Sequence, residues 1–228
     1  MNTPPTTSRS DRRRRRRGGA LLWSVAVVAA TALVVGLVGV VTETTGSASP
    51  TAITGTSLDG KQVTLDPGES GGAATASNAV TDTGDRLEVP SAGLDVPLGE
   101  LDAVDGQITP PGFSEAYRVR NTGVGLADRA DGTVFVVMHS LRNGAIGPGN
   151  LLIDVEGQRS RVAVGSSVRI GDARWTVTGS ERITKATVAA DADVWADEPG
   201  RLLLITCLQR PDGSASVDNV VIEATLDR

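Results

Sequence analysis

The sequence predicts an all-β domain, a closed barrel or sandwich of about eight short strands with short helical insertions. Two observations carry this prediction. Short apolar or alternating segments recur from residue 86 to the C-terminus, and turns rich in Gly and Pro separate them. Almost none of this region has a helical pattern. Aromatic residues make up only 3% of the chain, so the core is expected to consist mainly of Val, Leu, Ile and Ala.

One transmembrane helix is expected ahead of this domain. Residues 20–42 carry no charge, and about 20 apolar residues span a bilayer as a helix. Arg12–Arg17 directly precede them, so residues 1–19 are predicted to be a cytoplasmic basic tail and the rest of the chain to lie outside. Two alternatives stay open. In the first, residues 20–42 belong to a signal peptide that is cleaved at a weak site, Ser47–Ser49. In the second, the arginines bind nucleic acid.

Residues 43–85 are predicted to form a flexible extracellular linker. They are dense in Thr, Ser, Gly, Ala and Asp, and their scattered apolar residues bury too little surface to offset the chain entropy. Some alternation over Thr51–Leu65 is compatible with a transient hairpin. Residues 86–228 are expected to fold as the β domain.

The elements of that domain are expected in a definite order. Strands are expected to begin at Leu87 and Leu94. Each of these segments contains a proline, which suits a strand at the edge of a sheet. A turn follows at Asp105-Gly106, and Glu115–Arg120 is a short strand or a turn of helix. The remaining strands are expected at Thr133–Met138, Leu151–Val155, Arg161–Val164, Ser167–Ile170, Arg174–Val177, Leu202–Cys207 and Asn219–Leu226, with a short helix at Ala189–Asp197.

The chemistry is expected at Cys207 and His139, the only cysteine and the only histidine of the chain. Each stands at the polar end of an apolar strand, and strand ends can bring a thiol and an imidazole together. A single cysteine excludes an internal disulfide and a Cys-rich zinc site. The alternative is structural, since a lone buried cysteine often acts as a small apolar residue and a lone histidine as a hydrogen-bonded one.

These motifs resemble those of a known family. Leu204-Ile-Thr-Cys207 resembles the Leu-x-Thr-Cys signature of sortases, the membrane-anchored cysteine transpeptidases of Gram-positive bacteria. Leu87–Leu98 is similar to the family's opening strands, Gly132–His139 to its histidine strand and Asp218–Ala224 to its last strand. The resemblance covers about residues 86–226 and is nearest to the actinobacterial class E and F groups.

The resemblance implies a sortase-type eight-stranded barrel and a Cys–His–Arg site. Cys207 would attack the Thr–Gly amide of a C-terminal sorting signal of the Leu-Pro-x-Thr-Gly kind, and His139 would protonate the leaving amine. The partners implied are surface proteins with such signals, and a peptidoglycan or pilin amine as acceptor, or water. The enzyme would be a single-pass protein of the cell membrane with its catalytic domain outside. No cofactor, metal or nucleic-acid partner is expected. No metal-ligand spacing stands out, and the position of the arginines directly against the expected spanning segment favours a role in topology over nucleic-acid binding.

The resemblance also implies substrate-binding residues. Glu181–Gly200 corresponds to the family's substrate-cradling loop, with Val188 and Val194 as pocket residues and Trp195 as a packing or binding residue. The hydroxyl or backbone of Thr206 would position the substrate.

The sequence departs from the family at the arginine. The family places it just before the final strand, where Val217 stands here. Arg210, three residues after Cys207, is the expected replacement and Arg142 a second candidate. A solvated loop arginine is an equally good interpretation of Arg210 and the better one of Arg142. Met138 also replaces the glycine usual before the histidine. A second hypothesis is therefore a catalytically degenerate domain that binds envelope peptides or proteins without transpeptidation.

Overall fold

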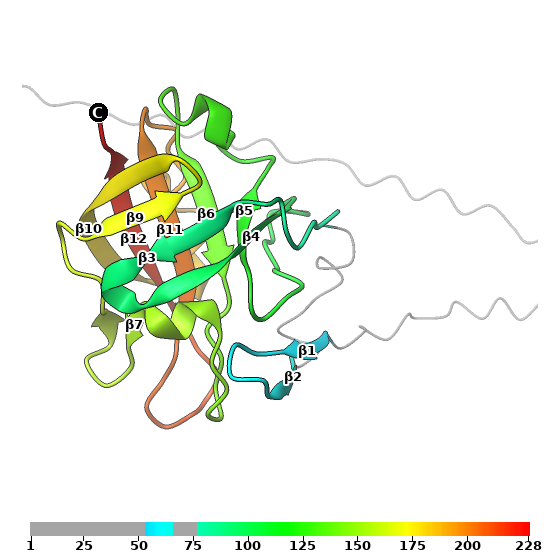
Figure 1. The fold of residues 1–228 in the computed structure, drawn as a ribbon. Coiled ribbons are helices and arrows are strands. Elements are labelled where there is room, and N and C mark those ends of the chain that lie inside the picture. Colours follow the sequence, from blue (N-terminus) through cyan, green and yellow to red (C-terminus); the bar gives the residue numbers. More distant parts are fainter. Residues whose placement is uncertain (1–52, 66–76) are drawn as a thin grey trace, which may run out of the picture. The chain divides into compact units, whose positions relative to one another are not determined.

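The computed structural model of the chain describes residues 53–65 and 77–228 (Figure 1). The expected basic tail at 1–19 and membrane anchor at 20–42 lie outside these residues, as does part of the expected linker. Within the two described ranges, no helix has the length and apolar character needed to cross a membrane.

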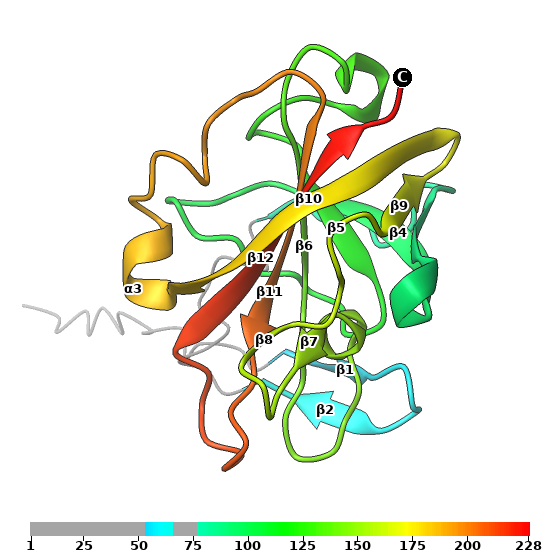
Figure 2. The same ribbon diagram turned by 90° about the vertical axis from the view of Figure 1, so that its left-hand side faces the viewer.

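Eight strands close into a barrel, which confirms the all-β prediction. Their order around the barrel is β10-β12-β11-β6-β5-β4-β3-β9 (Figures 1 and 2). The strands are β3 (Arg86–Val89), β4 (Leu94–Leu101), β5 (Ala116–Val119), β6 (Val134–Met138), β9 (Ser167–Ile170), β10 (Ala173–Thr184), β11 (Arg201–Leu208) and β12 (Asp218–Leu226). Two small hairpins are described besides, formed by β1 (Thr54–Thr56) with β2 (Gln62–Thr64) and by β7 (Ile153–Asp154) with β8 (Arg159–Ser160).

Apolar side chains pack on both faces of the strand β11. Successive side chains of a strand point to opposite faces. Leu202 and Leu204 therefore join the main core inside the barrel, which includes the buried Trp175. Leu203 and Ile205 join a second core on the outer face of the same wall. This second core explains why β11 has a continuous apolar run instead of an alternating pattern.

The outer-face core is covered by the connection between β10 and β11. Val194 is buried in it, and Trp195 packs with its ring centroid 5.2 Å from that of Phe135. The only α-helical turn of the described residues, α3 (Lys185–Val188), begins this connection (Figure 2). Three 3-10 turns lie at η1 (Pro90–Ala92), η2 (Leu126–Asp128) and η3 (Pro148–Leu151).

Two expected elements do not form, and the two strands expected at a sheet edge, β3 and β4, each pair on both sides within the closed barrel. The helix expected at Ala189–Asp197 is replaced by the turn at α3, because β10 continues to Thr184 and pairs with β12 along that length, across a register shift after Val177. The strand expected at Arg161–Val164 does not form. Val162 is buried in the main core, whereas Val164 is 70% exposed, so the alternation there does not place both valines on one buried face.

Part of the expected linker is ordered against the barrel. The β1–β2 hairpin places Ile53, Val63 and Leu65 on a small apolar cluster of Phe113, Leu141 and Ala145. The backbone N–H of Leu58 also donates to the carbonyl of Ile146, 2.8 Å away. The prediction of a flexible linker is therefore wrong for residues 53–65. Their apolar side chains bury surface against loops that lie far along the chain, which composition alone does not reveal.

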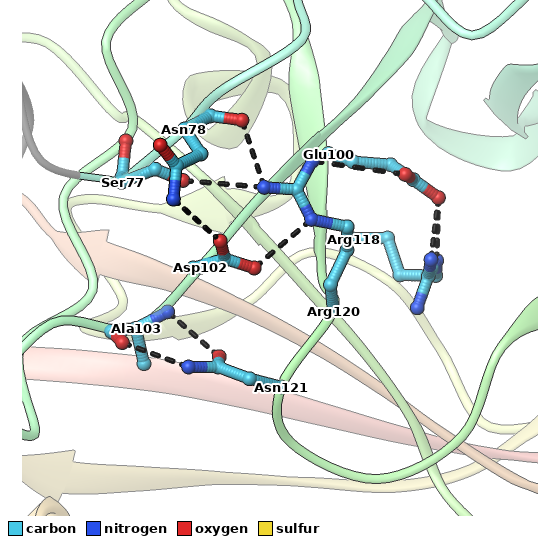
Figure 3. A network of polar contacts seen from close by, with 8 residues as sticks. All are labelled: Ser77, Asn78, Glu100, Asp102, Ala103, Arg118, Arg120 and Asn121. Carbon is cyan, nitrogen blue, oxygen red and sulfur yellow. Dashed lines mark hydrogen bonds and ion pairs between the residues drawn. The ribbon is translucent and has the colours of Figure 1, made fainter.

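Ser77 and Asn78 are also held, by a polar network at the ends of β4 and β5 (Figure 3). Arg120 donates from Nε to Asp102 at 2.9 Å and from Nη2 to the Asn78 carbonyl at 2.7 Å. Val80 forms an isolated bridge with Glu100. Hydrogen bonding to Arg120, and to Asn78, lowers the pKa of Asp102, so the carboxylate keeps its charge in this network.

Candidate active site

Cys207 and His139 lie at the ends of two neighbouring parallel strands. β6 and β11 pair in parallel with Thr206 opposite Met138, so Cys207 and His139 occupy the next register position. Adjacent strands lie about 4.8 Å apart, and side chains at the same register point to the same face. Both residues therefore face outward above the second core, on the face that also carries Val137 and Ile205. Both are half-buried, so each reaches solvent.

A clamp of hydrogen bonds fixes this register. Thr206 Oγ1 donates to the Met138 carbonyl at 2.9 Å, and Ser140 Oγ donates to the Cys207 carbonyl. Gln209 Nε2 donates to the carbonyl of Ser140 at 2.8 Å and to its hydroxyl at 2.9 Å. Thr206 and Gln209, which flank Cys207, are thus tied to Met138 and Ser140, which flank His139. This leaves the two reactive groups little freedom to separate.

The imidazole of His139 is oriented by its own contacts. Its Nε2 lies 2.9 Å from the Pro110 carbonyl, and since a carbonyl only accepts, Nε2 carries the hydrogen and Nδ1 has the lone pair. The Phe113 ring lies 5.3 Å away, between centroids. Burial lowers the pKa of His139, and the nearby charge of Lys185 lowers it further, against the effect of the Pro110 hydrogen bond. The histidine is therefore a neutral proton acceptor near pH 7.

The first cavity beside this pair is mostly apolar. Its volume is about 600 Å³. Ile108 and Pro110 line it from the β4–β5 connection, and Val188 and Trp195 from the β10–β11 connection. Of the described residues that line it, only Lys185 is charged. Such a cavity suits an extended peptide with apolar side chains.

The second cavity is polar and lies against the N-terminal hairpin. Its volume is about 390 Å³. Residues 61–65 line one part of it, and Ser140, Arg142 and Gln209 another. In the part of the chain that the structure describes, three residues line both cavities, and they are Cys207, His139 and Lys185. The thiol, the imidazole and one ammonium group thus stand where two distinct binding spaces meet.

Lys185 is the site residue that sequence reasoning missed. It is the first residue of α3 and follows β10, whose Thr184 pairs with Asp218 of β12. Its backbone N–H donates to the Val217 carbonyl at 2.9 Å, so Lys185 stands directly across from Val217. The alternation Arg182-Ile183-Thr184 was the available signal, because it extends β10 beyond Val177 and carries Lys185 to the barrel end.

Arg210 is not brought to the Cys207–His139 pair. Its exposed guanidinium lies 3.6 Å from Asp212, and it lines neither cavity. The reason is local. β11 ends at Leu208, and a turn in which Gly213 N–H donates to the Arg210 carbonyl at 3.0 Å leads the chain away. Arg142 does line the second cavity.

The other expected site residues have mixed placements. Val188 lines the first cavity, whereas Val194 is buried in the outer-face core beneath it. Trp195 both packs and lines the cavity, and its Nε1 donates to the Val188 carbonyl at 2.6 Å. Thr206 contributes to the cavity lining, but its hydroxyl is bound to Met138. That hydroxyl therefore positions a strand and does not face a substrate.

Neither family models nor curated proteins match the chain. Among solved structures, sortase A of Listeria monocytogenes is 19% identical, with 63% of this chain and 86% of that chain covered and a TM-score of 0.44. The pilus-related sortase C of Group B Streptococcus is 14% identical, with coverage of 65% and 69% and a TM-score of 0.47. Sortase C-1 of Actinomyces oris is 14% identical, with coverage of 63% and 73% and a TM-score of 0.44.

Proposed function

We propose that the domain is a cysteine transpeptidase of the sortase type, which forms a thioester on Cys207 and passes the acyl group to an amine. The observation that carries this proposal is that two cavities of different chemistry meet at Cys207, His139 and Lys185. Acyl transfer between two peptides requires one space for the donor and one for the acceptor, with the nucleophile at their junction.

The first half-reaction uses the thiol and the neutral imidazole. The Cys207 thiol gives its proton to Nδ1 of His139, and sulfur attacks the donor carbonyl carbon while that carbonyl's π pair moves to oxygen. The tetrahedral intermediate then collapses, the C–N bond breaks, and the leaving amine takes the proton from His139. The products are a thioester on Cys207 and a free amine.

The second half-reaction reverses these roles. An acceptor amine attacks the thioester carbon, its proton passes to His139, and the Cys207 sulfur leaves and regains a proton. Water gives hydrolysis by the same route. The polar second cavity suits the acceptor, whereas the apolar first cavity suits the donor.

The sequence motif narrows the substrates within this proposal. A sorting signal of the Leu-Pro-x-Thr-Gly kind, cleaved between Thr and Gly, offers the apolar side chains that fit the first cavity. The acceptor would be an amine of peptidoglycan or of a pilin. Residues 20–42 would anchor the protein, with the N-terminus in the cytoplasm and the barrel outside. The likeness of the motifs to class E and F sortases belongs to the same proposal.

Covalent capture tests the proposal. Incubation with a peptide of the sorting-signal kind should give an acyl adduct on Cys207 by mass spectrometry, and an added amine should release it as a new amide. Cys207→Ala is the matched control and should give neither product. Absence of adduct and product with the intact thiol would refute transpeptidation.

A second function is a binding module without catalysis. It is favoured by Val217, which is 53% exposed and stands where the resembling family has an arginine. Such a module would bind the peptide with equal affinity before and after Cys207→Ala, and would release no amine.

A further inference from the structure

We propose that Lys185 is a catalytic residue, whose ammonium group stabilises the oxyanion that forms on the substrate carbonyl during acyl transfer to and from Cys207. This inference rests on the proposed function, because it assigns a role within that chemistry. Lys185 thereby takes the role that was expected of Arg210.

A group that stabilises the oxyanion must reach the carbonyl that Cys207 attacks, whether the acyl group arrives from the donor or leaves to the acceptor. Lys185 lines both cavities together with Cys207 and His139, and its charge acts on the imidazole. No other cation among the described residues lines both.

The charges around Lys185 leave its ammonium group available. Within residues 53–65 and 77–228, no Asp or Glu lines either cavity and no ion pair involves Lys185. Lys61, a second cation at the polar cavity, differs in this respect, since its Nζ lies 2.8 Å from Asp59 and donates to the Gly144 carbonyl. A cation without a carboxylate partner, next to a thiol, can bind an anion that appears only during reaction.

The reaction creates such an anion. When sulfur attacks the carbonyl, one full negative charge develops on oxygen, and donors or cations aimed at that oxygen lower the barrier. Asn219, the cross-strand partner of Cys207, also lines the first cavity but is neutral. A lysine has a long stem and three donors, so from the end of β10 its ammonium reaches over the cavity junction.

Two small reagents separate this role from others. Acylation of Cys207 by p-nitrophenyl acetate passes through a tetrahedral oxyanion, whereas alkylation by iodoacetamide does not. Lys185→Met should slow acylation by about tenfold, less than the loss known for buried oxyanion donors because Lys185 is exposed. Alkylation should change less than threefold. Lys185→Arg should keep acylation within about threefold of the unchanged protein, since it retains a cation.

Arg210→Met is the matched control and should alter neither rate. Equal rates of acylation in the unchanged protein and Lys185→Met would overturn the proposal. So would an equal fall of acylation and alkylation, or a failure of Lys185→Arg to keep the rate. Acylation by p-nitrophenyl acetate requires no peptide recognition. The proposed transpeptidase function and the proposed role of Lys185 can therefore fail independently of each other. If Lys185→Met loses ester acylation but keeps normal alkylation, the role of Lys185 is supported even if sorting-signal peptides never react.

Discussion

Thr206 and Met138 are joined by a 2.9 Å hydrogen bond from the threonine hydroxyl to the methionine carbonyl, one residue before Cys207 on β11 and His139 at the end of β6. Parallel pairing by itself fixes the register of two strands only through evenly spaced backbone bonds. The added side-chain bond locks that register at the point where the thiol and the imidazole follow. The alignment of the reactive pair thus depends on a buried hydroxyl that does not face the substrate.

Thr206→Val tests this dependence. Valine keeps the shape but removes the donor, leaving the Met138 carbonyl without that partner. We expect a loss of about 1–2 kcal/mol in the free energy of unfolding, measured by urea denaturation. Acylation of Cys207 by p-nitrophenyl acetate should also slow. Thr206→Ser retains the hydroxyl and should keep most of the rate, and equal behaviour of the two variants would contradict the register argument.

Gly149→Ala tests the close approach to β11 of the loop that follows His139. A Cβ at Gly149 would stand 1.9 Å from Thr206 Oγ1 and 3.0 Å from the His139 carbonyl oxygen, so the loop or the clamp must shift. We expect a cost of about 1–3 kcal/mol in the free energy of unfolding. Gly179→Ala is the control, because a Cβ there meets nothing within 4 Å. Equal stability of the two variants would show that the loop moves freely.

Much of the barrel was predictable because its strands are apolar runs bounded by turns. β6 and β11 stand out for a further reason, since both faces of these strands are covered and their runs are nearly continuous. The reactive residues at their ends followed from uniqueness, as the chain has one Cys and one His. The parallel register that places Cys207 beside His139 was not predictable from the sequence pattern.

Two parts of the site depend on contacts between distant segments. Lys185 enters it because β10 pairs with β12 up to Thr184, and the local alternation that extends β10 does not show which strand it pairs with. Residues 61–65 enter it because the β1–β2 hairpin packs on Phe113 and Leu141, across a long stretch of chain. Arg210 was favoured by closeness in sequence to Cys207, but a turn directs it away.

Asp59→Asn tests how the hairpin is held. Asp59 accepts hydrogen bonds from Ser57 Oγ at 2.6 Å and the Ile146 N–H at 3.0 Å, and pairs with Lys61. Bonding to Lys61, then to Ser57 and Ile146, lowers the pKa of Asp59 strongly, so the acceptor is a carboxylate. We expect faster amide exchange over residues 53–65 in the variant and unchanged exchange in β11. Asp105→Asn is the control, and hairpin exchange equal in both variants would exclude the proposed anchor.

The pH dependence of stability should reflect His139. Burial holds its folded-state pKa below the ordinary value of about 6.5, so the unfolded chain binds the proton more tightly. The contribution of the neutral His139 to the free energy of unfolding is then fully present above about pH 6.5. It declines as the pH falls from there to the folded-state pKa, and levels off below that pKa. The imidazole resonance of the untagged protein, the only one present, should titrate below pH 6.5.

His139→Gln removes this linkage and is the matched variant. Its free energy of unfolding, compared with that of the unchanged protein at pH 7.5 and pH 5.5, should fall less on acidification. An imidazole that titrates at or above pH 6.5 would contradict the burial argument and would also remove the neutral acceptor from the proposed reaction at mildly acid pH.

The two cavities should respond to separate substitutions. Ala189 is exposed and lines the first cavity, whereas Thr64 is exposed and lines the second. Ala189→Trp should occupy donor space and raise KM for a sorting-signal peptide, with ester acylation of Cys207 unchanged. Thr64→Trp should leave formation of the peptide thioester unchanged but lower the ratio of amine transfer to hydrolysis, because water needs less room than an amine-bearing peptide. Both effects are read from one assay that follows thioester, amide and acid by mass spectrometry.

Two other outcomes would contradict this assignment. If Ala189→Trp changed the transfer ratio and Thr64→Trp changed KM, the donor and acceptor cavities would be reversed. If both variants changed both quantities alike, the cavities would act as one groove and the two-space mechanism would be wrong.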